Sequence, residues 1–250
     1  MGDGHLSNVY NIKFIDANIS NLEGLKNFLI NNFKIRENSI SIYSKKAKGR
    51  SFVLNINYAL FGRVLYSLGA PKGNKTKQPF FVPQWIINSK KHSRMFLKAL
   101  LEDEVTRIKI VKKNHCNSPQ LKMAKQEIHL DNLRIFLGQV KNMIENHGVD
   151  CSDIPKKPGF KDGQKTKELY FNINRNKRNI INFKKQIGFY LNSEKIRKLN
   201  ECCNILEKTL RPIINKKVVL KLREQGLSIR KIAKEMNTSS STIHRIVKVS

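Results

Sequence analysis

Three consecutive acids, Glu102, Asp103 and Glu104, end an apolar stretch with helical spacing, RMFLKALLEDE. Carboxylate oxygens are the ligands that Mg²⁺ prefers, so these residues have the chemistry to bind a divalent cation and support metal-assisted hydrolysis. Acids at the C-terminal end of a helix also oppose its dipole, so the arrangement costs stability unless a cation compensates. The competing interpretation is a solvated, acid-rich helix end, and the local sequence does not decide between the two.

Residues 219–248, VLKLREQGLSIRKIAKEMNTSSSTIHRIVK, form the most specific local pattern in the chain. We expect one helix to end at Gly226, Ser228 to cap a second helix over 229–236, and Asn237 to make the turn before a third helix that begins after Thr238. The residues predicted to be buried are Ile232, Met236, Ile243 and Ile246, with the small Ala233 where the helices approach. This is the layout of a helix-turn-helix, and it resembles that of resolvase and invertase recombinases.

The third helix of such a motif enters the DNA major groove by its N-terminal end. Short hydroxyl side chains suit phosphate and base-edge contacts, and arginine pairs with guanine or phosphate. The residues predicted to face DNA are Ser239, Ser240, Thr242, His244 and Arg245, with Lys231 and Lys248 on backbone phosphates. A plain amphipathic hairpin docked on the rest of the chain is the alternative, and the Gly-Leu-Ser start and serine-rich third helix argue against it.

Composition gives the strongest global signal. The 250 residues include 48 lysines and arginines but only 19 aspartates and glutamates, so the net charge is 48 − 19 = +29. Nucleic acid is the usual partner that offsets such an excess, whereas a lysine-rich solvated surface is the bland alternative. Cations spread along the whole chain, and the lack of a long apolar run, argue against a membrane partner. Without a secretory signal, and with four cysteines in no metal or disulfide spacing, we expect reduced thiols and a cytoplasmic, nucleoid-associated protein.

The elements that must position these residues recur in two halves. In the first, we expect a strand at 9–14, a helix at 20–33 capped by Ser20 with Glu23 in a capping box, a hairpin of 39–44 with 51–56, and helices at 58–69 and 91–104. In the second, we expect a strand at 106–113, a helix at 131–148 capped by Asp131, a strand at 167–175, and helices at 177–189 and 192–210. The repeat of about 110–120 residues predicts a pseudo-two-fold α+β domain followed by the all-α helix-turn-helix.

FLKALLEDE resembles the motif helix of the LAGLIDADG homing endonucleases, and LFGRVLYSLGAPKGNKT and NIINFKKQIGFYLNSEKIRKL resemble flanking segments of the archaeal-type members. The similarity extends over residues 1–208. It implies a pseudo-dimer of αββαββα repeats that lies on double-stranded DNA as a monomer. The resemblance implies that Glu104 is one catalytic, metal-binding acid and that Asp3, in the opening GDGHL, is the other, with Mg²⁺ between them for double-strand cleavage.

The chain departs from this family in two places. We expect the apolar helix that should precede Asp3 to be truncated, which predicts that the apolar face of residues 95–101 is exposed. Val105 stands where the family has glycine, a poor substitute if that position needs a positive φ angle. Both departures bear on catalysis and spare DNA binding. The predicted domains are residues 1–105 and 106–210, the two repeats with the first motif helix truncated, and the helix-turn-helix at 211–250.

Three functions remain open from the sequence. The first is a metal-dependent DNA endonuclease, with Lys45, Lys46, Lys72 and Lys75 as candidates for the assisting base. The second is a degenerate, non-cleaving relative that acts as a DNA-binding regulator or a maturase-like nucleic-acid binder. The third is a recombinase accessory protein, for which no serine or tyrosine nucleophile constellation is present. We expect no small-molecule substrate. Because no splicing-type residues flank the domain, we expect a freestanding protein and not an intein.

Overall fold

The computed structural model describes residues 4–45, 51–106, 108–112, 115–155, 159–160, 166–190, 192–208 and 214–248. The chain divides into two compact units, Met1–Ile205 and Leu206–Ser250. Asp3 and Lys46, both named above, lie outside the described residues.

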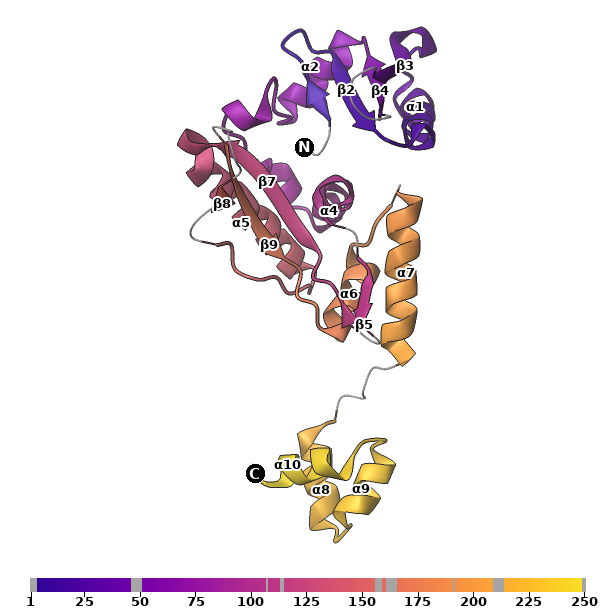
Figure 1. The fold of residues 1–250 in the computed structure, drawn as a ribbon, viewed down its shortest axis with the longest axis vertical. Helices are drawn as coiled ribbons and strands as arrows, with labels where there is room; N and C mark the ends of the chain where they lie inside the picture. The colour runs from indigo at the N-terminus through magenta and orange to yellow at the C-terminus, as the bar shows by residue number, and fades with distance from the viewer. Residues whose placement is uncertain are drawn as a thin grey trace. The chain divides into compact units, whose positions relative to one another are not determined.

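The first half of the larger unit is an antiparallel sheet with one helical cover (Figure 1). Strands β1 (His5–Leu6), β2 (Ile12–Asp16), β3 (Ile40–Lys45) and β4 (Ser51–Ile56) are ordered β1-β2-β4-β3. Helix α1 (Ile19–Phe33) packs on the face where Ile12, Ile40 and Ile56 stand in one register row. Helix α2 (Ala59–Ser67) follows β4. The predicted hairpin of β3 with β4 is therefore present.

The second half repeats this order of elements. Helices α3 (Gln84–Ile87) and α4 (Lys90–Glu104) lead into β5 (Ile110–Lys112), β6 (His115–Cys116) and β7 (Gln120–Gln126). Helix α5 (Leu130–Asn146) then precedes β8 (Gly159–Phe160) and β9 (Thr166–Asn172), and α6 (Lys177–Gln186) and α7 (Ser193–Lys208) follow. The sheet order is β7-β9-β8. From α4 onward the order is one helix, three strands, one helix, two strands and two helices, because the short strands β5 and β6 form a hairpin of their own before β7. The predicted α+β fold is confirmed.

Burial of alternate side chains explains why the second sheet forms. Strands β7 and β9 pair from Gln120 with Asn172 to Gln126 with Thr166, and Leu121, Leu169 and Phe171 on one face are almost completely buried. Helix α5 covers that face with an apolar stripe at intervals of three and four residues, which is the spacing of a single helical face. The buried members of the stripe are Leu133, Phe136, Leu137, Val140, Met143 and Ile144.

Some details differ from the sequence-based expectations. Asn18, and not Ser20, caps α1, because its side chain accepts a hydrogen bond from the Ser20 amide at 3.0 Å. Helix α5 begins behind a short 3₁₀ turn, so Asp131 lies in its first turn and does not cap it. The predicted stops at Gly69, Gly148 and Gly188 are confirmed by their positive φ angles.

A buried lysine joins the two halves. Lys125, on the covered face of β7, is 1% exposed and donates a hydrogen bond to the Gln78 carbonyl at 2.8 Å and another to Asn132 Oδ1. Its ammonium lies 3.8 Å from the centre of the Phe80 ring. Asn132 in turn accepts from the Phe80 amide and donates to the Phe80 carbonyl, both at 3.0 Å. The segment before α3 is therefore fixed against the second sheet by a polar network.

We predict a pH-dependent contribution of Lys125 to stability. Burial lowers the pKa of Lys125 to about 8, below the ordinary 10.5 that it recovers on unfolding. Between these two values the unfolded chain binds more protons, so this group makes the protein more stable as pH rises, by at most about 1.4 kcal/mol per pH unit. The measurement is the free energy of unfolding at pH 7 to 10 for the wild type and Lys125→Met.

The free energy of unfolding of the wild type minus that of Lys125→Met should become more positive as the pH rises. Lys122→Met is the matched control, because Lys122 lies on the opposite, exposed face of the same strand. Parallel pH profiles for the wild type and Lys125→Met would contradict this account.

The smaller unit contains three short helices, α8 (Lys216–Glu224), α9 (Ile229–Glu235) and α10 (Ser240–Lys248). Its core is Val219, Ile232, Ala233 and Ile243, with Met236 and Ile246 half-buried against it. Gly226 and Asn237 have positive φ angles, and Ser228 Oγ accepts from the Lys231 amide at 3.3 Å. The predicted caps and turn are confirmed, and Ile232 and Ile243 are buried as predicted, whereas Met236 and Ile246 are half-buried. In the described part of the chain, no helix has the length and apolar character to span a bilayer.

Candidate nucleic-acid interface and metal-binding acids

The end of α4 holds Glu104 where a helix meets a sheet. Val105 is extended, is 3% exposed, and forms an antiparallel bridge with Leu121 of β7. The next residue continues the pairing, since the Thr106 amide donates to the Gln120 carbonyl at 3.0 Å. Because helix and sheet are both packed into the core on either side of it, the backbone at Glu104 is fixed.

The three acids at this helix end differ in their surroundings. Glu102 is buried, at 8% exposed, and its carboxylate accepts hydrogen bonds from the amides of Tyr190 at 3.2 Å and of Asn192. It thereby fixes the turn that leads into α7. Asp103 is exposed and Glu104 half-exposed. Glu102 is thus engaged with backbone donors, whereas the side chains of Asp103 and Glu104 reach solvent.

The cation that should compensate the acidic helix end is Lys195 of α7. It is 8% exposed, and its Nζ donates to the carbonyl of Glu102 and to that of Val105, the latter at 2.8 Å. A positive charge on the carbonyls of a last helical turn interacts favourably with the dipole. Lys195 therefore offsets the cost that the acids impose on α4.

The structure changes the interpretation of the two departures from the family that the sequence shows. Val105 has φ −89° and ψ 136°, an ordinary extended conformation, so valine fits this backbone without strain. The predicted exposure of residues 95–101 holds for one side only: Met95 is 53% exposed and Ala99 is exposed, whereas Leu97, Leu100 and Leu101 are buried. A cavity of about 210 Å³ beside Ala99 is lined by side chains of β2 and α1 from the first half, among them Phe14, Leu22 and Leu25.

The described residues supply one of the two predicted metal-binding acids. Glu104 offers a partly exposed carboxylate, and Asp3 lies outside the described residues. Among the residues that the structure describes, no group of three or more His, Cys, Asp and Glu side chains could hold a metal ion. Glu104 fits a hard cation such as Mg²⁺, which keeps several waters and binds through only one or two carboxylates.

The face of each sheet opposite to the one that packs on α1 or α5 carries polar side chains, although Val53 on that face of the first sheet is buried. In the first sheet, Lys13, Asn55 and Ser41 stand in one row, and exposed Tyr43 stands in the next row of that face. In the second sheet, exposed Lys122 pairs across the strands with Tyr170. The local sequence patterns did not predict these polar faces. Their lysine and hydroxyl groups are of the kinds that bind nucleic-acid phosphates.

The predicted DNA-contacting residues lie along α10 and beside it. Ser240, His244, Arg245 and Lys248 are exposed on the helix, and Lys231 is exposed on α9. Thr242 is half-buried. Ser239 caps the helix, because its Oγ accepts from the Thr242 amide at 3.3 Å, and it also lies 2.8 Å from Thr242 Oγ1. Ser241, which the sequence analysis omitted, is exposed in the first turn of α10.

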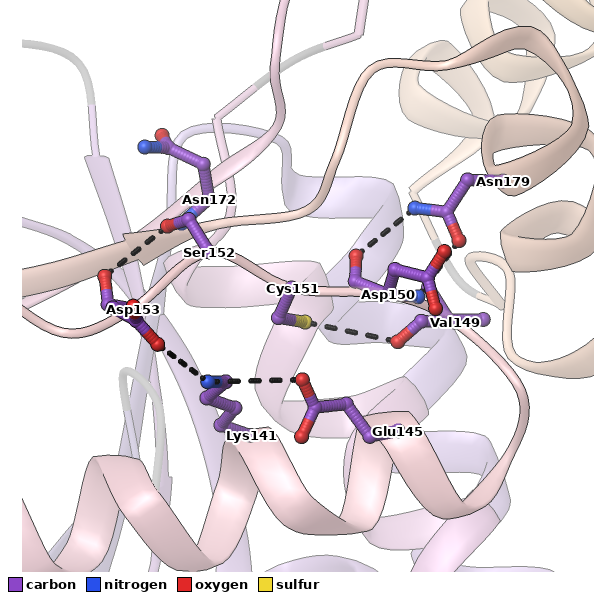
Figure 2. Close-up of polar contacts among 9 residues, drawn as sticks. All are labelled: Lys141, Glu145, Val149, Asp150, Cys151, Ser152, Asp153, Asn172 and Asn179. Carbon is purple, nitrogen blue, oxygen red and sulfur yellow. Dashed lines mark hydrogen bonds and ion pairs between the residues drawn. The ribbon is translucent and has the colours of Figure 1, made fainter.

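A polar cluster after α5 has a structural role. Figure 2 shows Lys141 between Asp153, at 3.2 Å, and Glu145, at 3.7 Å. Nearby, Ser152 Oγ accepts from the Asn172 amide at 3.0 Å, which ties the segment to β9. Burial raises the pKa of the Cys151 thiol to about 12, so the thiol stays protonated and is a weak nucleophile.

Comparison with known proteins gives a local match and several distant ones. The family model for the helix-turn-helix domain of resolvase matches residues 211–248, which confirms the predicted resemblance of this segment. The chain is 27% identical over 248 residues to the replication factor C small subunit of Methanocaldococcus jannaschii, covering 95% of this chain and 13% of that protein. It is 31% identical over 139 residues to the RNA polymerase subunit Rpo1N of the same organism, covering 52% of this chain and 10% of that protein. The chain thus spans about an eighth or less of these relatives.

Solved structures of a homing endonuclease also resemble the chain. I-DmoI in complex with DNA and Ca has a TM-score of 0.48 at 15% identity, covering 75% of this chain and 82% of that one. Mesophilic variants of I-DmoI give a TM-score of 0.49 at 15% identity, covering 77% of this chain and 83% of theirs.

Proposed function

We propose that this chain binds double-stranded DNA at specific sequences through its helix-turn-helix and hydrolyses both strands in a divalent-metal-dependent reaction, as an endonuclease of the LAGLIDADG type. The observation that carries the DNA-binding part is the match of residues 211–248 to the resolvase helix-turn-helix, together with the exposed polar face of α10. A net charge of +29 supplies the electrostatic attraction to phosphate.

In this proposal α10 reads base edges. Ser240 and Ser241 lie in its first turn, and Arg245 lies one turn further along the same exposed side. Lys231 and Lys248 contact backbone phosphates and fix the register of the module on the duplex. Lys13, Tyr43, Lys122 and Tyr170, on the polar sheet faces, would bind a second stretch of DNA.

For cleavage, Glu104 would hold the metal ion together with Asp3. The ion, Mg²⁺ in the cell, would supply an activated water and stabilise the leaving oxygen. The chain's own part is to hold the Glu104 carboxylate at a fixed point, which it does by packing α4 and pairing Val105 with Leu121. Lys195 assists by neutralising the helix end that carries the acid.

A non-cleaving DNA-binding regulator is the second candidate. It is favoured by the exposed Met95 and Ala99 on the side of α4 where the fold family places a partner helix. In this case the helix-turn-helix retains its role. Prolonged incubation with cognate DNA and Mg²⁺ or Mn²⁺ separates the candidates, since the regulator leaves both strands intact.

The DNA-binding part is tested by Arg245→Ala. The preferred site is first selected from a pool of random duplexes, and the affinity is then measured by fluorescence anisotropy. We expect a loss of about 1–3 kcal/mol, or roughly 5- to 150-fold, with relaxed preference at one base pair. Arg197→Ala is the control, because Arg197 is exposed on α7 and already paired with Glu201. Equal affinities for the two variants would contradict the role of α10.

A further inference from the structure

One side of α2 is an exposed apolar ridge. Leu60, Val64 and the capping residue Leu68 stand at intervals of four residues, so they share a side of the helix, and they are between 45% and 60% exposed. A neighbouring side, with Phe61 and Leu65, packs against the core of the first sheet. The apolar band of α2 is therefore wider than the side that the sheet covers, although a helix normally buries such a band.

The second half contains an equivalent helix with this side buried. Helices α2 and α6 both end in an apolar residue followed by a glycine with a positive φ angle, Leu68-Gly69 and Ile187-Gly188. When these pairs are aligned, the ridge corresponds to three residues of α6 that are at most 4% exposed, Asn179, Phe183 and Ile187. The ridge on α2 thus occupies a position that is covered in the other half.

Helices cover α6 in that half. The Cys203 thiol of α7 lies 3.9 Å from the Ile180 carbonyl oxygen, and Arg94 of α4 donates to the Lys185 carbonyl at 3.0 Å. A helix is therefore the element that suits the ridge on α2. In the described chain, the cavity beside Ala99 is lined from β2 and α1 but not from α2, so the ridge is separate from the exposed side of α4.

Aromatic side chains stand at the end of the ridge. Trp85 of α3 donates its indole N–H to the Leu68 carbonyl at 3.0 Å, and its side chain is still exposed. Exposed Tyr66 meets Tyr10 edge to face, with the ring centres 6.0 Å apart. Tryptophan and tyrosine often dominate the energy of protein interfaces. Because the aliphatic ridge has no rings on which bases could stack, a protein fits it better than a single-stranded nucleic acid does.

The charges around the ridge are positive. From residue 38 to residue 101 the sequence has no aspartate or glutamate but twelve lysines and arginines, and this stretch includes α2, α3 and most of α4. Exposed Arg63 lies beside the ridge on α2, and the Lys72 ammonium lies 5.1 Å from the Tyr66 ring centre. A second copy of this chain would bring the same positive charge, so the complementary partner is acidic.

We propose that the ridge of α2, with Trp85 at its end, binds an acidic amphipathic helix of a partner protein. Apolar side chains of that helix pack against Leu60, Val64 and Leu68, and its carboxylates face Arg63 and Lys72. This interaction does not depend on DNA binding, because α2 packs on the core face of the first sheet, opposite to its polar face.

The test uses the fluorescence of Trp85, the only tryptophan among the 250 residues. The probe is a synthetic helical peptide of about five turns, with leucines at intervals of three and four residues and glutamates elsewhere. When it is added to the full chain, the emission of Trp85 should move to shorter wavelength, because the ring leaves water. The same peptide with lysine in place of every glutamate should leave the emission unchanged.

The variant Leu60→Gln/Val64→Gln should weaken peptide binding roughly 10-fold or more, because it removes two apolar anchors from the ridge. Its affinity for duplex DNA should equal that of the wild type. The control variant Ile128→Gln/Ile135→Gln removes two exposed apolar side chains from the second half and should bind the peptide normally.

Four results would overturn the proposal. They are no response of Trp85 to the acidic peptide, an equal response to the lysine peptide, a response to phosphatidylserine vesicles alone, and self-association that Leu60→Gln/Val64→Gln abolishes. The last two would assign the ridge to a lipid surface and to a second copy of the chain. A variant that loses DNA affinity as well would place the ridge in the DNA interface and also contradict the proposal. If the wild type binds the peptide but no DNA, this proposal stands and the proposed function fails.

Discussion

Glu104→Gln should abolish metal-dependent DNA cleavage and leave DNA affinity unchanged. Glutamine has the size of glutamate but no charge, so it holds a divalent cation poorly while it preserves the packing of α4. Losing several kcal/mol of stabilisation of the transition state corresponds to a fall in rate on the order of 10³-fold or more. The measurement is the rate at which a plasmid with the selected site is linearised in Mg²⁺, with affinity measured in parallel.

Asp103→Asn is the matched control for this experiment. Asp103 is the adjacent acid and is exposed. Its substitution by asparagine removes one negative charge from the same helix end. Both changes weaken the unfavourable interaction with the helix dipole to a similar extent. If Asp103→Asn stops cleavage and Glu104→Gln does not, the assignment of the metal-binding acid is wrong. A wild type that binds but never nicks its site supports the regulator.

Glu102→Gln should lower the stability of the larger unit by about 2–3 kcal/mol, although it lies next to the same two acids. The buried carboxylate accepts from two backbone amides, and hydrogen bonds to charged groups contribute about 1.5–3 kcal/mol each. Oε1 accepts from both amides, and a neutral glutamine oxygen in its place accepts these bonds more weakly. The NH₂ group takes the place of Oε2, which accepts from the Tyr190 amide, so two donors then face each other in a buried site. For a unit of this size the midpoint of thermal unfolding should fall by about 5–10 °C.

The control is again Asp103→Asn, because the Asp103 side chain is exposed. The free energy of unfolding of this variant should match that of the wild type within about 0.5 kcal/mol. Lys195→Met should also destabilise the unit, because it removes the donor to the Glu102 and Val105 carbonyls. The double variant Glu102→Gln/Lys195→Met should cost less than the sum of the two single changes, since both act on the same contact between α4 and α7. Additive effects would show that the two side chains act independently.

Local patterns predicted the helix-turn-helix in detail. Its caps, turn and core depend on residues within about thirty positions of one another, so Ser228, Asn237 and Ile243 have the roles that their spacing indicates. The same is true of the glycine stops at Gly69 and Gly148. In these cases the energy that fixes each residue is a hydrogen bond or a φ angle within a single turn.

Longer-range features were beyond the reach of local patterns. The role of Glu102 depends on amides 88 and 90 residues later in the chain, and the compensating Lys195 lies 93 residues away from it. Strand β7 was missed because Lys125 interrupts its apolar alternation, and that lysine is tolerated inside only because Gln78 and Asn132 accept its hydrogen bonds. A sequence shows the charge of such a residue but not the partner that the fold brings to it.

The most direct test of the account is the affinity of the full chain for its selected duplex as the salt concentration rises from 50 to 200 mM. A protein that neutralises six or more phosphates releases their counterions, so log affinity should fall linearly with log salt with a slope of about −5 or steeper, a loss of roughly 10³-fold. The same chain should prefer the selected duplex over an unrelated one throughout. A slope near zero, or equal affinity for every duplex, would contradict the proposal that this is a sequence-specific DNA-binding protein.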